Sequence, residues 1–280
     1  MTDRKEQFPR IADLPAQSPL FWVEQKDRYL RQLLIRDIQD ITKRRLVVYF
    51  ANRYEAGSEI DHRDCSFISE IFGDLGDAPV DLLLETNGGN TDAAESIITY
   101  LKNITADFRV VVANGAKSNG TLIALAAKSI VMGATSELGP IEPAVQGIPC
   151  SILTQPQIAN TNFALHMMGS YALQQSKNLA RKLLSEGMMQ KKTLAEIDEI
   201  VQKISSRDVY SSHGASIDFN EAKSLGLAID YIKPDDDLWR RIWLLYCMYD
   251  FDAKKSRYLK FFEGQARSTA IAAPPKPPTA

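Results

Sequence analysis

Short apolar segments alternate with longer segments of helical periodicity through most of this chain. The apolar segments are RRLVVYFAN (44–52), VDLLLET (80–86), FRVVVANG (108–115) and SIVMG (129–133). Runs of this length, rich in Val, Leu and Ile, are typical of strands that are covered on both faces, as in a parallel sheet. The segments between them repeat their apolar residues at helical spacing. Strands joined by helices predict an α/β fold built from right-handed crossover units.

A pair of glycines follows the second apolar segment, in LLLETNGGNTDAAESI. Gly88 and Gly89 let the backbone turn with positive φ and leave their N–H groups uncovered. A helix is predicted to begin at once, with Thr91 or Asp92 as its N-cap. Amides at a helix N-terminus suit an anion, although an ordinary strand-to-helix turn is the alternative. The sequence contains neither GxGxxG nor GxxxxGK[ST], which disfavours a phosphate loop.

Ser118 follows the next apolar segment and precedes a run of small apolar residues, in ANGAKSNGTLIALAA. A serine on a strand-to-helix turn is exposed, and the backbone N–H of the next residue points into the space beside it, as in a nucleophile elbow. We expect the amides of Gly89 and Asn119 to converge on one oxyanion. A helix N-cap is the alternative role for Ser118.

Four segments form one combined pattern: ETNGGNTDAAESI (85–97), AKSNGTLIALAAKSIVMG (116–133), ELGPIEP (137–143) and HGASIDFNEAKSLGLAID (213–230). The pattern resembles the serine dehydrogenase proteinase family, which is grouped with the Clp peptidase subunits and signal peptide peptidase A in the Clp/crotonase superfamily. The resemblance covers roughly residues 45–230. It implies a Clp/crotonase-type α/β spiral of ββα units, here with a helical C-terminal extension.

The resemblance also implies a serine endopeptidase. Ser118 would attack a peptide carbonyl, the amides of Gly89 and Asn119 would hold the oxyanion, and Gly88 would support that turn. The family usually has proline before the two glycines and a small residue after the serine, whereas this sequence has Asn87 and Asn119. Asn119 therefore adds bulk and a polar amide next to the nucleophile.

The general base stays open between a lysine and a histidine, because relatives use either. The Clp-type histidine would lie near the GPIEP loop, where this sequence has Glu142 and no histidine. Lys177 and His166 lie three turns apart on the predicted helix 162–186, so both project from one face. A buried lysine with a lowered pKa serves as a base. Solvent exposure is the alternative for Lys177.

His213 is the third candidate base. The resemblance places it beside the position at which Clp relatives carry the acid of the triad, counting back from Glu221. A loop histidine bonded to backbone is the alternative. We rank His213 and Lys177 close together, with His166 behind them. Glu142 orients the base or caps its own loop.

The rest of the chain divides around this central segment. We predict an N-terminal arm and helix at 1–44, a peptidase domain at 45–233, an aromatic-rich helix at 234–265, and a disordered Pro/Ala-rich tail at 266–280. The aromatic residues of 234–265 recur at helical spacing, which is typical of a covering or subunit-contact helix. The resemblance also implies self-association, because Clp relatives are rings and peptidase A relatives are oligomers.

Composition excludes several classes of partner and cofactor. A formal net charge of −2 gives no electrostatic basis for nucleic-acid binding. Three histidines and three dispersed cysteines lack metal-ligand spacing, so we expect no metal and no cofactor, and the thiols are those of a cytoplasmic protein. No apolar stretch reaches the length of a membrane span. There is no Walker motif, so any ATP-driven unfolding would come from a separate ATPase partner.

Two other functions are compatible with the same fold. A crotonase-like acyl or thioester enzyme shares the two-amide oxyanion site, but the sequence near the glycine turn lacks the basic cluster that an acyl-CoA would need. A catalytically inactive, oligomeric binding protein would retain the fold and lose the base. Peptide or unfolded protein is the substrate that the first hypothesis predicts.

Overall fold

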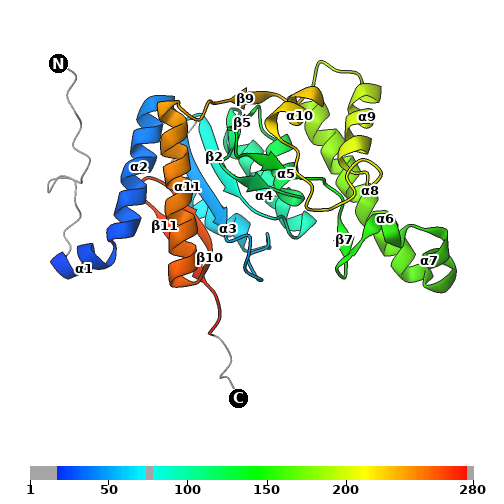
Figure 1. Ribbon diagram of the computed structural model, residues 1–280, viewed down its shortest axis with the longest axis horizontal. Coiled ribbons are helices and arrows are strands. Elements are labelled where there is room, and N and C mark those ends of the chain that lie inside the picture. The colour runs from blue at the N-terminus through cyan, green and yellow to red at the C-terminus, as the bar shows by residue number, and fades with distance from the viewer. Residues whose placement is uncertain (1–17, 74–77, 276–280) are drawn as a thin grey trace.

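A seven-stranded sheet forms the centre of the structure, a computed structural model that describes residues 18–73 and 78–275 (Figure 1). The strand order is β11-β10-β1-β2-β3-β5-β9. From β1 to β9 in this order all neighbours pair in parallel, whereas β10 and β11 are antiparallel. The strands are β1 (Arg45–Ala51), β2 (Val80–Glu85), β3 (Phe108–Val112), β5 (Ile130–Met132), β9 (Ile229–Tyr231), β10 (Tyr258–Glu263) and β11 (Ser268–Ala272).

Short extended segments beyond the parallel strands form a second, smaller layer. A helix follows each long and short pair, so β1, β2 and β3 each begin a ββα unit. The predicted Clp/crotonase-type α/β spiral is confirmed. The short pairings are β4 (Gly115–Ala116) with β6 (Glu137–Leu138), and the bridges Ile60 to Gly89, Thr86 to Ala116 and Leu138 to Ile217.

Helices cover both faces of the sheet. On one face, α2 (Lys26–Thr42) and α11 (Asp237–Ser256) lie side by side (Figure 1). The other face carries α3 (Asp64–Phe72), α4 (Thr91–Ile104), α5 (Asn119–Leu125), α8 (Phe163–Glu186) and α9 (Leu194–Ile204). The remaining elements are α1 (Pro19–Glu24), β7 (Ala144–Val145), β8 (Ile148–Pro149), α6 (Cys150–Leu153), α7 (Pro156–Thr161) and α10 (Phe219–Ser224).

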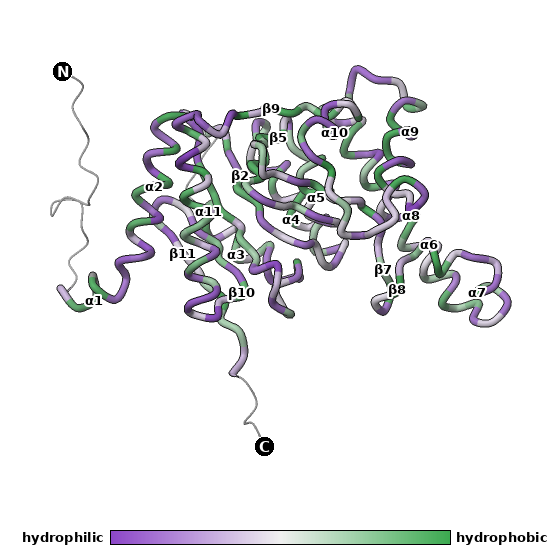
Figure 2. The backbone as a smooth tube through the Cα atoms, viewed as in Figure 1, coloured by the Kyte–Doolittle hydropathy of each residue, from purple (hydrophilic) through white to green (hydrophobic). Residues whose placement is uncertain are grey.

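The covering helices follow from their amphipathic patterns. Ile35 and Ile38 of α2 and Leu245 of α11 are buried in one cluster against the sheet, and Figure 2 shows hydrophobic and hydrophilic stretches alternating along both helices. The helix predicted within residues 1–44 forms as two pieces, because Gln25 caps α1 and α2 then begins. Of the predicted N-terminal arm, residues 1–17 lie outside the described residues.

The predicted C-terminal helix at 234–265 is wrong beyond Ser256. Arg257 adopts a left-handed conformation with φ 54°, which ends α11, and the chain then forms β10 and β11. β10 pairs with β1, so its aromatic residues are buried in the sheet. The disordered tail is wrong for Ser268–Ala272, which pairs with β10, and residues 276–280 lie outside the described residues.

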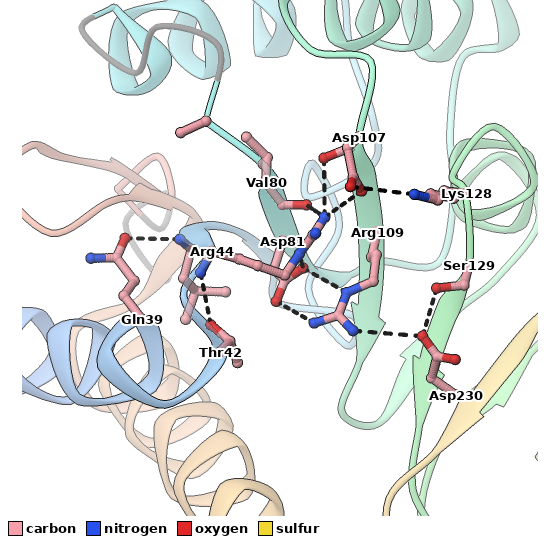
Figure 3. A network of polar contacts seen from close by, with 12 residues as sticks. Gln39, Thr42, Arg44, Val80, Asp81, Asp107, Arg109, Lys128, Ser129 and Asp230 are labelled. Carbon is pink, nitrogen blue, oxygen red and sulfur yellow. Dashed lines mark hydrogen bonds and ion pairs between the residues drawn. The ribbon is translucent and has the colours of Figure 1, made fainter.

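A ladder of ion pairs joins the N-terminal ends of the parallel strands (Figure 3). Arg44 donates to Asp81 and Asp107, and Arg109 binds Asp81 through two hydrogen bonds of 2.8 and 2.9 Å and pairs with Asp230. This end of the sheet is therefore occupied by structural charge pairs. Ligands of parallel sheets bind at the opposite, C-terminal ends of the strands, where the glycine turn and Ser118 lie.

Candidate active site

Ser118 lies between β4 and α5 in a strained backbone conformation. Its φ of 53° and ψ of −119° belong to a region that side-chain-bearing residues rarely adopt. Ser118 occupies the N-cap position of α5, but its side chain makes no capping hydrogen bond. The alternative of a plain N-cap therefore fails. The expected exposure of Ser118 is wrong for the residue as a whole, which is 9% exposed in this structure. Strain of this kind costs about 1–3 kcal/mol and collects at functional sites.

The Gly88-Gly89 turn lies directly against Ser118. Gly88 has φ +97°, and a Cβ on it would lie 2.7 Å from the Ser118 Cβ and 3.0 Å from the Asn119 nitrogen. Gly89 has φ +154° and packs against the backbone of Ile60, where a Cβ would lie 2.3 Å from the Ile60 nitrogen. Both glycines are needed, because positive φ and close backbone approach exclude a side chain. The two turns meet in space, as predicted.

Asn119 ties the two turns together. Its Nδ2 donates to the Gly89 carbonyl at 2.6 Å and to Thr91 Oγ1 at 3.3 Å. As the first residue of α5, Asn119 has a backbone N–H without an intrahelical acceptor. In the described part of the chain, no hydrogen bond uses the backbone N–H of Asn119 or of Gly89. The N-cap of α4 is Asn90, one residue before the predicted Thr91 or Asp92.

Lys117 is a buried site residue that sequence reasoning missed. Its side chain is 6% exposed, and Nζ donates to the Leu138 carbonyl at 3.1 Å and the Ala215 carbonyl at 3.0 Å. It also pairs with Glu137 at 2.9 Å. Burial lowers the pKa of Lys117, and Glu137 opposes that shift. The sequence does carry a feature that could have indicated a buried lysine here, since Lys117 stands between small residues in the segment AKSNG.

The Lys117 contact brings the loop that carries His213 to the serine turn. His213 is half-buried and lies two residues before Ala215, whose carbonyl accepts from Lys117. Burial lowers the pKa of His213, the nearby Glu142 opposes this shift, and Arg207 and Lys117 add to it. The imidazole is therefore held neutral at neutral pH, the form that accepts a proton.

Glu142 is a buried anchor beside this loop. Its Oε2 accepts from Arg207 Nε at 2.8 Å, and its Oε1 accepts from the Ser151 backbone N–H at 2.9 Å. The side chain is 2% exposed. Glu142 therefore holds the segment with Arg207 and His213 against the start of α6.

The structure does not join Lys177 or His166 to the serine. Lys177 Nζ donates to Gln202 Oε1 of α9 at 2.9 Å, and His166 Nδ1 lies 3.0 Å from the Leu153 carbonyl of α6. Both side chains are half-buried. Over residues 18–73 and 78–275, neither of them makes a hydrogen bond to Ser118, and His213 makes none to it either.

No group of metal-ligating side chains is found over the described ranges, and none of their helices is long and apolar enough to cross a membrane.

The chain aligns with two archaeal proteins, the uncharacterized proteins MJ0137 and MJ1495 of Methanocaldococcus jannaschii. The first is 31% identical over 167 residues, 57% of this chain and 56% of the relative. The second is 27% identical over 190 residues, 65% and 61% respectively. The chain thus spans less than two thirds of either relative.

Among solved structures, ClpP1 from Listeria monocytogenes is 18% identical with a TM-score of 0.43, covering 71% of this chain and 98% of that one. A point mutant of ClpP1 from the same organism is 17% identical with a TM-score of 0.47 and the same coverage. A mutant of 1510-N, a membrane-bound stomatin-specific protease, is 19% identical with a TM-score of 0.41, covering 65% and 79%.

A family model described as ClpP-like SDH-type serine proteinase matches residues 67–263, a span that contains the glycine turn, Ser118, Glu142 and His213. The match includes α11 and β10 as well, so the C-terminal elements are part of the family pattern. The chain belongs to the ClpP-like SDH-type serine proteinase family.

Proposed function

We propose that the protein is a serine endopeptidase with Ser118 as its nucleophile. The observation that carries this proposal is the strained, uncapped Ser118 turn packed against Gly88. A serine used only as a helix cap would bind the backbone of its own helix. Here the Ser118 hydroxyl makes no such bond, and its strained strand-to-helix turn is the kind of turn that carries the serine of a nucleophile elbow.

The backbone amides of Gly89 and Asn119 form the oxyanion site of this proposal. Both N–H groups lie in the two touching turns, and Gly89 is exposed. Negative charge that develops on the carbonyl oxygen during attack would be stabilised by these two donors and by the N-terminus of α5. The Gly88 carbonyl, in the same peptide group as the Gly89 N–H, accepts from the Ile60 N–H at 2.9 Å, and the Asn119 side chain binds the Gly89 carbonyl, so the donors are held before substrate arrives.

His213 is the base that this arrangement favours. It lies on the loop whose Ala215 carbonyl accepts from Lys117, the residue before Ser118. Its lowered pKa keeps the imidazole neutral. It would take the hydroxyl proton as Ser118 attacks and return it to the departing amine. Glu142, which influences the His213 charge, supports the loop. Lys177 is the less supported alternative, because its ammonium is bound to Gln202.

Peptides or unfolded protein segments in the cytoplasm are the proposed substrates, and no cofactor is needed for this chemistry. We further propose that the chain self-associates and that a separate ATPase supplies unfolded substrate. Figure 1 shows α6 and α7 extending away from the sheet. Ile152 of α6 and Phe163 and Tyr171 of α8 are exposed there, which suits a contact with another subunit.

Fluorophosphonate labelling tests the nucleophile directly. The wild-type protein should be labelled at Ser118, as located by mass spectrometry, and should cleave casein, whereas Ser118→Ala should do neither. Labelling that persists in Ser118→Ala would refute the proposal. His213→Gln should reduce casein cleavage by about 10²-fold or more, the usual contribution of a general base, whereas Lys177→Gln should retain it.

A further inference from the structure

Arg53 binds residues of both turns that make up the candidate site, or residues next to them. It follows β1 at the C-terminal edge of the sheet, and its side chain is 10% exposed. Nε donates to Asn87 Oδ1 at 2.6 Å, Nη1 to Glu85 Oε1 at 3.2 Å and Nη2 to Glu137 Oε1 at 3.0 Å. One planar guanidinium thus binds two segments that are far apart in the sequence, the segment 85–87 and Glu137.

The first of these segments is the glycine turn. Asn87 immediately precedes Gly88, and it returns the Arg53 contact, because Asn87 Nδ2 donates to the Arg53 carbonyl at 2.6 Å. This reciprocal pair fixes both the side chain and the backbone of Arg53 against the turn. The position of the Gly89 amide therefore depends on a residue that lies outside the turn itself.

The other contacts lead to the serine turn. Glu137 binds Arg53 with one carboxylate oxygen and Lys117 with the other, at 2.9 Å. Lys117 is the residue immediately before Ser118 in the chain. Glu85 binds Arg53 and also accepts from the Gly115 backbone N–H at 2.8 Å, which holds the start of the segment that leads to Ser118. Two separate routes thus run from Arg53 to the nucleophile.

The site is shaped for an arginine. A Cβ on Gly115 would lie 1.9 Å from Arg53 Nη1, so the guanidinium occupies the space that a side chain at 115 would need. The carboxylates of Glu85 and Glu137 raise the pKa of Arg53, although burial opposes this shift, and the charge is permanent. A lysine offers one point of charge and cannot make three bonds in a fixed plane.

We propose that Arg53 is a positioning residue that sets the spacing between the Gly89 amide and Ser118. It acts through Asn87 on the oxyanion side and through Glu137 and Lys117 on the nucleophile side. The inference rests on the proposed serine chemistry at Ser118. A shift of one part of a site by about 1 Å can cost about 10²-fold in rate, so removal of the clamp should slow attack by Ser118 strongly.

The test measures the second-order rate constant of fluorophosphonate labelling on the full chain, divided by the folded fraction. Arg53→Gln should react about 10- to 100-fold more slowly than the wild type, and Arg53→Lys should fall between them. Arg44→Gln is the matched control, since its side chain is 13% exposed and binds Asp81 and Asp107 at the opposite ends of the strands (Figure 3). This control should lose stability and keep the wild-type rate.

A second variant guards against a folding defect. Asn87 is exposed, so Asn87→Ala should fold, and it should slow labelling. Adding it to Arg53→Gln should cost less than Asn87→Ala costs in the wild type, because the two variants share the Nε–Oδ1 contact. Wild-type rates in Arg53→Gln and Asn87→Ala would overturn the role of Arg53 while leaving the nucleophile intact. An equal loss in Arg44→Gln would also overturn it. A wild-type protein without label at Ser118 would instead overturn the proposed function, and the inference with it.

Discussion

Replacement of Ser118 by glycine should stabilise the fold relative to replacement by alanine. Alanine keeps the strain of φ 53° and ψ −119°, and glycine removes it. That strain is worth about 1–3 kcal/mol. Glycine also gives the unfolded chain more freedom, which offsets about 0.5–1 kcal/mol. The net expectation is that Ser118→Gly is more stable than Ser118→Ala by about 0.5–2 kcal/mol. The hydroxyl makes no capping bond, so its loss contributes little to either variant.

Urea unfolding followed by circular dichroism measures this difference, and scanning calorimetry should show a melting temperature about 1–4 °C higher for Ser118→Gly. Both variants should be inactive. Gln146, in the turn between β7 and β8, provides a control because its φ is also 53°. Gln146→Gly should likewise exceed Gln146→Ala in stability, without any change in labelling. If the control behaves so and Ser118→Gly is no more stable than Ser118→Ala, the argument that the nucleophile turn stores strain is refuted.

Three further predictions concern the base, the glycine turn and the C-terminal strands. The rate of fluorophosphonate labelling should decline on acidification with an inflection below the ordinary histidine pKa of 6.5, because burial lowers the pKa of His213. A stopped-flow pH profile with its inflection above 7 would contradict the assignment of His213 as the base. The unfolded chain binds the His213 proton more readily than the folded one, so this group's contribution to stability falls as pH drops through 6.5. Gly88→Ala should lower the free energy of unfolding by about 2–4 kcal/mol, because alanine is strained at positive φ and its Cβ overlaps Ser118. The variant should also be labelled at least about 10²-fold more slowly than the wild type. Labelling at the wild-type rate would show that the two turns can separate without cost. Lys260→Met should lower the free energy of unfolding by about 3–5 kcal/mol, since it leaves the buried Asp64 carboxylate unpaired, and urea midpoints equal to the wild type would contradict a structural role for β10.

The central fold could be predicted because parallel strands need continuous apolar runs, and those runs are visible in the sequence. The Gly88-Gly89 turn and Ser118 could be predicted as a pair because each follows such a run and precedes a helix. The C-terminal hairpin could not. Tyr258–Glu263 continues the aromatic character of α11, and only pairing with β1 distinguishes strand from helix there.

The position of the proposed base could not be predicted from spacing either, because its separation from Ser118 is set by a loop. Lys177 lies on a long regular helix, where periodicity indicates its face, yet the partner that it finds is Gln202. His213 lies in an irregular segment that is positioned by contacts from distant parts of the chain, among them that of Lys117 with the Ala215 carbonyl. No pattern in a single sequence reports a side-chain-to-backbone bond across 98 residues.

The two ends of the sheet show why a buried charge is weak evidence of function by itself. Arg44 and Arg53 flank the same strand, are similarly buried, and each binds two carboxylates. The difference lies in what their partners hold. The carboxylates bound to Arg44 belong to strand ends that are already fixed by the sheet. The carboxylates bound to Arg53 also bind Gly115 and Lys117, in the short segment that leads to Ser118. That segment is held by pairings of only one or two residues, so side-chain contacts add to its positioning, and the proposed catalytic geometry is sensitive to them there.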